Sequence, residues 1–499
     1  MTAGIGVIVR AVPNQHKCTA FLSTGRSEGR QAERTRCITV RIAGFFVCRR
    51  LGQQCFAFCN GNWNKGRAQD GNWMARQRLA IIGAGPKAVA IATKAACLRD
   101  LAALPLEVVI FERDVIGAAW TGQFGYTDGL QRLCTPAERD VGFPYDTDLA
   151  ADLDRAMLAR FSWTAFQIET ERYGDWVDRG RPKPTHQDFA QYLAWCLSGL
   201  GPIRFGPVTA LKHRNGRWSV RYTSRDSGAS ISEGRFDGVV VTGPGPQSTN
   251  LRKVADGRIF DGVDFWRPGV IAAVKQAAAS GPDDPVVIIG SGGTAAATAA
   301  ALVRADISND IRVLGSQAAL YARADSYFEN RTFRDPKFWS ALSAADRRTF
   351  SDRLTRGAVW SNVVNVLAGV ERIDYLQGAA KEVRFDPPGT VGGALMVVYA
   401  PSAHPDAEVP LQASAVIDAT GFDPMWFRTL LSPSLARKLN NEKKMRTQMA
   451  SDLSLPLEGV PRLHVPMISQ AVGPAYNSLM ALGSLSDAVL RPYVSAALA

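Results

Sequence analysis

Two glycine-rich turns, each between an apolar run and a helical run, constrain the fold of this chain most strongly. The first turn, Gly83–Ala88 (GAGPKA), follows the apolar run 79–82, and the second, Gly290–Ala295 (GSGGTA), follows the run 286–289. In such a turn the first glycine permits a tight bend, and the second lets the backbone approach a pyrophosphate. The helix that follows offers free N–H groups to the phosphates. The chain therefore predicts two dinucleotide-binding units, 290 − 83 = 207 residues apart.

The segments around both turns have the β-α-β pattern that such units need. In the first unit we expect a strand at 79–82, a helix at 88–98 and a strand at 108–111 that ends at Glu112. Glu112 lies 24 residues beyond Ala88, where a carboxylate can hold ribose hydroxyls. In the second we expect a strand, a helix over 295–303 and a strand over 311–314. The alternative is two α/β crossover turns that need glycine for steric reasons alone.

Two dinucleotide sites in one chain imply electron transfer between cofactors, with FAD at the first site and a nicotinamide at the second. The fold class is thus α/β, with two Rossmann-like domains. Strands entering Thr242–Gly245 and Ala419–Gly421 indicate where the chain leaves and re-enters the flavin domain. We expect FAD-binding parts at 74–250 and 411–499. The inserted NADPH-binding domain, which carries a substrate-contacting insertion, is expected at 251–410.

Residues 1–73 differ from the rest of the chain. They hold 11 Lys+Arg and 3 Asp+Glu, which is +8 of the net +12, and five of the eight cysteines. They show no sustained helical or strand period. One hypothesis is a basic, disordered tail or a small metal site using Cys55 and Cys59. The favoured hypothesis is an upstream frame translated by mistake, with Met74 as the natural start.

The composition of the remaining residues narrows the expected partners, location and kinds of site of the protein. Without residues 1–73 the chain holds 58 − 11 = 47 basic and 46 − 3 = 43 acidic residues, which gives little reason to expect nucleic acid as a partner. No secretory signal and no integral membrane segment are expected. Three scattered thiols after Met74 fit a reducing, cytoplasmic location. The five histidines are unclustered, so we expect no metal site and no catalytic triad.

Two absences narrow the class of flavoprotein. The chain has no C-x-x-C, whereas two-site disulfide reductases need a redox-active cysteine pair. Baeyer–Villiger and general flavin monooxygenases carry F-x-G-x-x-x-H before the second glycine turn. Here Phe260 and Gly262 are followed by Trp266 in place of the histidine.

Five segments carry a family resemblance: 127–133 (TDGLQRL), 139–145 (RDVGFPY), 325–330 (DSYFEN), 333–336 (FRDP) and 418–424 (DATGFDP). In this order they resemble the microbial N-hydroxylating monooxygenases of siderophore biosynthesis, and within them the mycobactin-type lysine N6-hydroxylases of actinobacteria. The resemblance covers about 76–490. It implies a class B flavin monooxygenase architecture, FAD and NADPH as cofactors, a small-molecule amine and O2 as substrates, and a homo-oligomer.

The resemblance also implies roles for particular residues. Those implied to bind the cofactors are Gly83, Gly85, Pro86, Lys87, Glu112, Trp120, Gln131, Gly290, Gly292, Thr294, Thr420, Gly421, Asn477, Leu485 and Ser486. Trp120 and Gln131 correspond to residues that line the flavin ring. Those implied to contact the amine substrate are Arg139, Asn330 and Gln131. No catalytic side chain is expected, because the flavin carries the oxygen chemistry.

Plainer interpretations stand beside these roles. Trp120 can be a core aromatic, Arg139 and Asp140 a solvated surface pair, and Asn330 a cap of the turn before 333–336. Arg491 stands where the family usually has serine, which weakens the implied contacts near the C-terminus.

The expected nicotinamide is NADPH. The strand over 311–314 ends in Gly315 and Ser316, with no acidic residue to hold a free 2′-hydroxyl. Arg323 is the nearest candidate cation for the 2′-phosphate, and a surface arginine is its alternative.

The expected function is N6-hydroxylation of L-lysine, free or acylated, with NADPH and O2, to supply a hydroxamate precursor for a mycobactin- or nocobactin-like siderophore. The alternatives are an L-ornithine N5-monooxygenase, a flavin reductase or oxidase of the same fold, and a non-catalytic scaffold. The reacting amine must be neutral, and a free lysine amine titrates near pH ~10.4, so the site must be desolvated or cationic.

Overall fold

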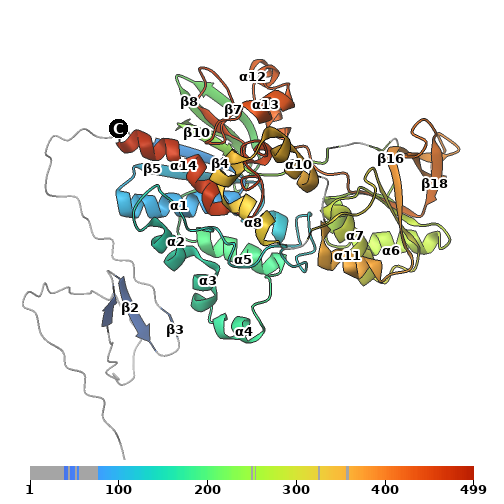
Figure 1. The fold of residues 1–499 in the computed structure, drawn as a ribbon, viewed down its shortest axis with the longest axis horizontal. Coiled ribbons are helices and arrows are strands. Elements are labelled where there is room, and N and C mark those ends of the chain that lie inside the picture. Colours follow the sequence, from blue (N-terminus) through green and yellow to red (C-terminus); the bar gives the residue numbers. More distant parts are fainter. Residues whose placement is uncertain are drawn as a thin grey trace, which may run out of the picture. The chain divides into compact units, whose positions relative to one another are not determined.

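The structure is a computed structural model that describes residues 77–248, 251–252, 254–323, 326–355, 359–390 and 392–498, together with three short strands nearer the N-terminus. The chain divides into two units, Met1–Asn72 and Trp73–Ala499. In the first unit β1 (Thr39–Ile42), β2 (Phe45–Arg50) and β3 (Gln53–Gln54) form an antiparallel sheet that the sequence analysis did not predict. The hypotheses about Cys55, Cys59 and Met74 lie outside the described residues (Figure 1).

The first sheet of the larger unit is parallel and has the strand order β20-β10-β4-β5-β6. Its strands are β4 (Gln77–Ile82), β5 (Leu106–Glu112), β6 (Ile203–Phe205), β10 (Gly238–Val241) and β20 (Arg462–His464). The helix α1 (Pro86–Ala102) joins β4 to β5 and packs against α14 (Leu482–Leu498). Residues 86–98 of α1 are all buried, as expected for an alanine-rich helix between a sheet and another helix.

Smaller elements surround the first sheet. Between β5 and β6 lie η1 (Ala118–Trp120), α2 (Leu153–Phe161), α3 (Trp163–Glu169), α4 (Tyr173–Asp178) and α5 (His186–Leu197). An antiparallel sheet follows, made of β7 (Val208–Arg214), β8 (Arg217–Thr223) and β9 (Ser230–Phe236). Near the C-terminus lie η3 (Trp426–Leu430), α12 (Pro433–Lys438), α13 (Glu442–Gln448) and η4 (Pro466–Ile468).

The second sheet has the order β11-β19-β12-β13-β16-β17-β18. Its parallel part comprises β11 (Ile259–Asp261), β12 (Val286–Ile289), β13 (Ile311–Gly315), β16 (Ile373–Asp386) and β19 (Ala415–Asp418). The antiparallel edge adds β17 (Ala394–Pro401) and β18 (Val409–Ala413). The other elements of this part are η2 (Asp264–Trp266), α6 (Val270–Ser280), α7 (Gly293–Arg304) and α11 (Ser361–Ala368). Both expected β-α-β units are present, so the two-domain α/β fold class is confirmed.

The strand before Ala419 corrects one domain boundary. Residues 411–499 are predicted to belong to the flavin domain, but β18 and β19 pair within the second sheet. The return to the first sheet therefore begins after Asp418. It runs beside the outgoing segment, because Gln247 Nε2 donates to the backbone carbonyl oxygen of Asp418 at 3.1 Å and Ser248 N donates to that of Gly421 at 3.0 Å.

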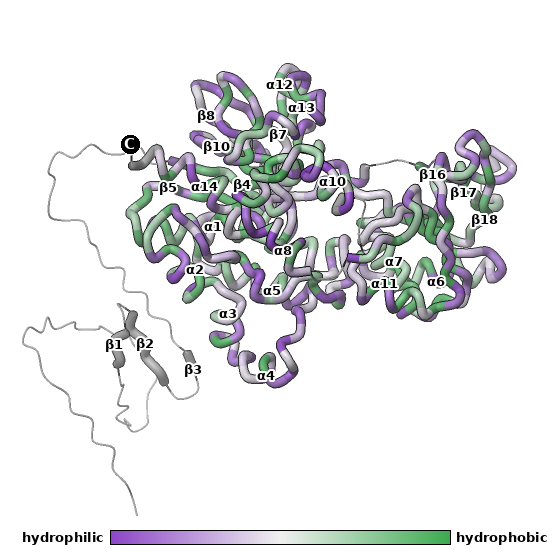
Figure 2. The backbone as a smooth tube through the Cα atoms, in the orientation of Figure 1, coloured by the Kyte–Doolittle hydropathy of each residue, from purple (hydrophilic) through white to green (hydrophobic). Residues whose placement is uncertain are grey.

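An insertion after β13 contacts the part of the larger unit that contains the first sheet. It holds β14 (Ala322–Arg323), α8 (Tyr327–Arg334), α9 (Pro336–Ala341), α10 (Ala344–Thr355) and β15 (Val359–Trp360). A Cβ atom on Gly473 would lie 3.8 Å from the Trp339 ring of α9. Hydrophobic and hydrophilic residues intermingle along most of the chain in Figure 2, and no helix of the described residues is long and apolar enough to cross a membrane.

Candidate active site

The first glycine turn lies at the carboxyl end of β4. Gly83 has φ +93°, and a Cβ there would stand 2.7 Å from Thr242 Oγ1. A Cβ on Gly85 would meet nothing within 4 Å. Pro86, which lacks an N–H, occupies the first turn of α1, and no side chain of the described residues caps that helix. The turn thus leaves helix N–H groups and open space for a pyrophosphate, so these residues fit a dinucleotide.

Glu112 ends β5 beside this turn. Its Oε2 accepts a hydrogen bond from Ala84 N at 2.6 Å, and its Oε1 accepts one from Asp114 N at 2.8 Å. Burial raises the pKa of the carboxyl group, whereas these two hydrogen bonds lower it. Each oxygen keeps a second acceptor site, so the carboxylate can still receive ribose hydroxyls.

Two predicted cations converge on one segment before α14. Lys87 Nζ donates to the backbone carbonyl oxygen of Asn477 at 3.2 Å, and Arg139 Nη1 donates to the backbone carbonyl oxygen of Met480 at 3.0 Å. Burial lowers the pKa of Lys87 to about 8. Lys87, Arg139 and Asn477, which are far apart in the sequence, therefore lie in one region of the fold.

Asp140 behaves differently from its neighbour Arg139. It is buried, accepts hydrogen bonds from the Tyr145 hydroxyl at 2.6 Å and Trp163 N at 2.9 Å, and has a pKa raised to about 6 by burial. Arg139 is half-buried with its guanidinium over the Phe143 ring. The interpretation of Arg139 and Asp140 as a solvated surface pair is therefore wrong.

Trp120 and Gln131 lie near the same edge of the first sheet. Gly117, three residues before Trp120, donates its N–H to the Ala84 oxygen of the glycine turn at 3.0 Å. Gln131 Nε2 lies 3.4 Å from Thr127 Oγ1. His186 Nδ1 lies 2.8 Å from the same hydroxyl, and the His186 and Trp120 ring centroids are 4.8 Å apart.

His186 is a candidate that is missing from the sequence-based predictions, because the five histidines are unclustered in the sequence. Its neighbours in the fold come from segments about 55 to 66 residues earlier in the chain. The one local signal is its place directly after Thr185, which begins α5 with a capping box completed by Asp188.

The second glycine turn has the geometry of the first. Gly290 has φ +133°, and a Cβ there would stand 2.5 Å from the Ala419 oxygen. Gly292 precedes the first turn of α7, which holds Thr294, and no side chain of the described residues caps this helix. A nicotinamide pyrophosphate fits this turn for the same reasons.

The second turn adjoins the linker that follows β19. The Thr420 hydroxyl donates to Asp418 Oδ1 at 2.7 Å, and Gly421 has φ +112°. Thr420 and Gly421 were predicted to bind a cofactor, and the contact between Ala419 and Gly290 places them beside the second glycine turn.

Arg323 and Asn330 both lie in the insertion. The Arg323 guanidinium stacks 4.5 Å from the Phe333 ring and lies 3.9 Å from Glu329, and only 15% of the side chain is exposed. A solvated surface arginine is thus the wrong interpretation. Asn330 lies inside α8, and Asp335 caps α9 instead by accepting from Lys337 N and Phe338 N. The turn-cap interpretation of Asn330 is therefore also wrong. Asp325 lies outside the described residues.

Leu485 and Ser486 lie in α14 and have no exposed surface. Leu485 is part of the main hydrophobic core, and the Ser486 hydroxyl donates to the Leu482 oxygen at 2.9 Å. Packing of α14 therefore occupies both side chains, and the cofactor contacts implied for Leu485 and Ser486 stay predictions.

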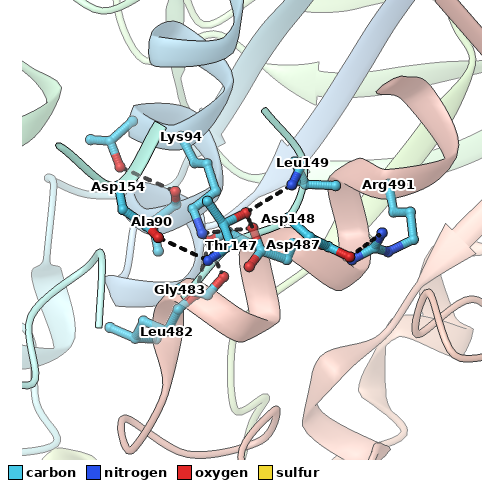
Figure 3. A network of polar contacts seen from close by, with 12 residues as sticks. Ala90, Lys94, Thr147, Asp148, Leu149, Asp154, Leu482, Gly483, Asp487 and Arg491 are labelled. Atoms are coloured by element: carbon cyan, nitrogen blue, oxygen red, sulfur yellow. Dashed lines mark hydrogen bonds and ion pairs between the residues drawn. The ribbon is translucent and has the colours of Figure 1, made fainter. Parts of the chain in front are cut away.

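A polar network lies between α1, α14 and the segment 147–149 (Figure 3). Lys94 Nζ donates to Asp487 Oδ1 at 2.7 Å and to the Gly483 oxygen at 2.9 Å, and Thr147 Oγ1 also donates to Asp487. Arg491 pairs with Asp148 at 2.5 Å. Within the described residues no group of three or more His, Cys, Asp or Glu side chains could hold a metal ion.

Comparisons with known proteins agree with this arrangement. The sequence model of the L-lysine 6-monooxygenase/L-ornithine 5-monooxygenase family matches residues 139–368. The L-lysine N6-monooxygenase MbtG of Mycolicibacterium paratuberculosis is 34% identical over 437 residues, which are 83% of this chain and 94% of that relative. The chain belongs to this family of monooxygenases.

Solved structures give the same answer. The lysine monooxygenase NbtG from Nocardia farcinica has 33% identity and a TM-score of 0.66, covering 83% of this chain and 99% of that one. The ornithine N-hydroxylase KtzI of Kutzneria sp. 744, solved with reduced FAD, NADP+ and L-ornithine, has a TM-score of 0.65 at 17% identity over 83% of this chain and 98% of that one. At that identity KtzI supports the fold alone. NbtG, at 33% identity, has an NADPH domain.

Proposed function

We propose that this chain is an L-lysine N6-monooxygenase that uses FAD, NADPH and O2. It would supply a hydroxamate precursor for a mycobactin- or nocobactin-like siderophore. The reaction consumes lysine, NADPH, a proton and O2, and it yields N6-hydroxylysine, NADP+ and water. The observation that carries the proposal is the pair of glycine turns, each before an uncapped helix, in a chain 34% identical to a lysine N6-monooxygenase over most of its length.

FAD and NADPH, when bound, would supply the redox chemistry of the reaction. The chain's own residues bind and orient. Gly83, Gly85, Pro86, Lys87 and Glu112 would hold FAD, and Gly290, Gly292 and Thr294 would hold NADPH, with Thr420 and Gly421 at the junction. Trp120 and Gln131 would line the flavin ring, and Asn477 would approach it.

The substrate must present a neutral amine, and the region around Arg139 has features that favour one. Lys87 and Arg139 place two cationic groups near one segment, and the Lys87 side chain is buried, which lowers its pKa to about 8. Nearby cations and desolvation both lower the pKa of an amine. Arg139, Asn330 and Gln131 would contact the rest of the substrate.

Several finer points belong to the same proposal. The flavin domain would comprise about 77–248 and 424–498, and the NADPH domain about 254–418. Gly315 at the end of β13 and Ser316 after it leave the 2′ position of the ribose without a carboxylate partner, which favours NADPH. Arg323 would have to leave Phe333 and Glu329 to bind the 2′-phosphate. A homo-oligomer in the cytoplasm, without a nucleic-acid partner, completes the proposal, and the free cysteines Cys97, Cys134 and Cys196 are consistent with a reducing compartment.

The ornithine alternative has less support, because the relatives at 33–35% identity are named lysine N6-monooxygenases. A test is to reconstitute the protein with FAD and measure hydroxylamine with lysine, ornithine or N6-acetyl-lysine, each with NADPH and with NADH. We expect product from lysine with NADPH. Product from ornithine alone would establish the alternative, and no hydroxylamine from any amine would overturn monooxygenation.

A further inference from the structure

His186 stands where three segments of the candidate site meet. It is the first residue of α5, and its backbone N–H donates to the backbone carbonyl oxygen of Gln131 at 2.7 Å. The next residue, Gln187, donates to the Gly129 oxygen at 3.0 Å, and Leu133 N donates to the Pro184 oxygen at 2.9 Å. The loop 127–133 is therefore bound along its length to the start of α5.

The His186 side chain continues this connection. Thr127, which is buried, receives hydrogen bonds on its Oγ1 from Gly129 N at 3.1 Å and from Gln131 Nε2 at 3.4 Å. Since a hydroxyl oxygen has two acceptor sites, its own proton is left to donate to His186 Nδ1, 2.8 Å away. In this arrangement His186 accepts at Nδ1 and carries its proton on Nε2.

The imidazole also touches the aromatic residue proposed to line the flavin ring. Its plane meets the Trp120 ring at 81°, with centroids 4.8 Å apart, in an edge-to-face contact. The Trp120 segment packs directly on the loop, because a Cβ on Gly122 would stand 2.5 Å from the Asp128 oxygen. One histidine thus contacts Trp120 and, through Thr127, the amide of Gln131.

We propose that His186 is a positioning residue for amine hydroxylation, which fixes the Trp120 ring and, through Thr127, the Gln131 amide against the flavin. The proposal rests on the proposed function and adds a role for a residue outside the glycine turns. A well-oriented ring pocket excludes water and holds the amine near the reacting oxygen, which determines how much NADPH consumption ends in product. Poor positioning would divert the same NADPH, O2 and a proton to NADP+ and hydrogen peroxide.

The electrostatic setting agrees with an acceptor at Nδ1. Burial lowers the pKa of His186 to about 4, and Asp128, the charged neighbour that opposes this shift, pairs with Arg304 at 2.6 Å. The imidazole is therefore neutral near pH 7. A protonated ring would donate at Nδ1 and so lose its hydrogen bond from Thr127.

The test compares variants of the FAD-loaded full chain by the yield of hydroxylamine per NADPH oxidised. His186→Asn keeps an acceptor near the Nδ1 position, whereas His186→Ala removes both contacts. Thr127→Val and Thr127→Ser form a second pair that removes or keeps the hydroxyl. His464→Asn is the matched control, because His464 is also buried but contacts Asp452 and Tyr493 instead.

We expect His186→Ala and Thr127→Val to lower the yield per NADPH about tenfold, with a matching rise in hydrogen peroxide. His186→Asn should recover part of the yield, and Thr127→Ser most of it. Equal hydroxylamine yields per NADPH in all variants that bind FAD, or an equal loss of yield in His464→Asn, would mean that His186 has only a structural role. If the parent makes no hydroxylamine, the proposed function fails separately. The visible circular dichroism of bound FAD then tests positioning, and an unchanged spectrum in His186→Ala would overturn it.

Discussion

Gly83 and Gly85 stand two residues apart in one turn, yet a methyl group would meet different surroundings at each. Gly83→Ala forces a side chain onto φ +93° and 2.7 Å from the Thr242 hydroxyl, so we expect a loss of about 1–3 kcal/mol in stability. Gly85→Ala meets no protein atom within 4 Å but fills the space proposed for the pyrophosphate. We expect that variant to fold normally and to lose FAD.

Thermal unfolding of the apoproteins and the flavin absorbance of the purified variants separate these two effects. The parent protein without FAD is the reference for stability. Normal FAD content in Gly85→Ala would contradict the placement of the pyrophosphate at this turn.

His464 is a residue whose titration should be visible in stability. It is buried, its Nδ1 lies 2.7 Å from the backbone carbonyl oxygen of Asp452 and its Nε2 lies 2.9 Å from the Tyr493 hydroxyl, and burial lowers its pKa to about 4. The unfolded chain, with a histidine pKa near ~6.5, binds the proton more tightly than the folded one. The contribution of neutral His464 to the free energy of unfolding is therefore complete above pH ~6.5 and is lost as the pH falls toward ~4. At pH ~5 the loss is about 2 kcal/mol.

Unfolding midpoints measured between pH 7 and pH 5 test this linkage. His464→Gln should show a shallower fall than the parent, although its stability at pH 7 is lower. Exposed His404→Gln is the control, and it should keep the parent's slope. An unchanged slope in His464→Gln would assign the acid sensitivity to other groups, of which His186 is the first candidate.

Residue-level prediction from the sequence succeeded where a local pattern carries the geometry. The spacing of the glycine turns singles out Gly83 and Gly290, and both residues have a positive φ. A Cβ atom on either one would lie too close to a neighbouring backbone or side-chain atom. His186 was missed because its partners, Thr127 and Trp120, come from distant segments, and no periodicity encodes that meeting. The binding role of Leu485 is implied by the family resemblance alone, and in the structure helix packing buries its side chain.

Among the elements, α1 and α14 are joined by a buried ion pair. Only 1% of the Lys94 side chain is exposed, and its Nζ contacts Asp487 and the Gly483 oxygen (Figure 3). Lys94→Ala leaves the partly buried Asp487 carboxylate without its cation, which costs about 3–5 kcal/mol. Urea unfolding followed by tryptophan fluorescence measures this loss.

Arg491→Ala provides the control on the same helix. The Arg491–Asp148 pair is exposed, with side-chain exposures of 50% and 72%, so its removal should cost no more than about 1 kcal/mol. Similar losses in the two variants would mean that the network contributes through packing alone.

At the same scale, strand positions were easier to predict than sheet membership. The apolar runs before both glycine turns became β4 and β12, since short runs of β-branched residues favour buried parallel strands. β19 was assigned to the wrong sheet, because its sequence resembles that of any buried parallel strand. Only its pairing with β11 and β12 decides the assignment.

For the whole molecule, the two crossings between the sheets form one junction. Residues 246–248 and 418–423 bond to one another through Gln247, Ser248 and Asp423 N, which donates to the Pro246 oxygen at 2.8 Å. The order of motifs in the sequence predicted both crossings. The contact between them depends on the paired geometry of two linkers about 170 residues apart.

The division of the chain at residues 72 and 73 leads to a prediction about the N-terminal segment. Both glycine turns and every residue proposed to bind a cofactor or substrate lie in the larger unit. Relatives such as MbtG align over 94% of their length while using only 83% of this chain. A protein that begins at Met74 should therefore bind FAD and hydroxylate lysine as the full chain does, with 8 fewer net positive charges.

Flavin content, unfolding midpoint and hydroxylamine yield per NADPH, compared at equal concentration between the shorter protein and the full chain, provide the measurement. A shorter protein that folds but loses product would show that residues 1–73 take part in the reaction, whereas equal activity would locate it within 74–499.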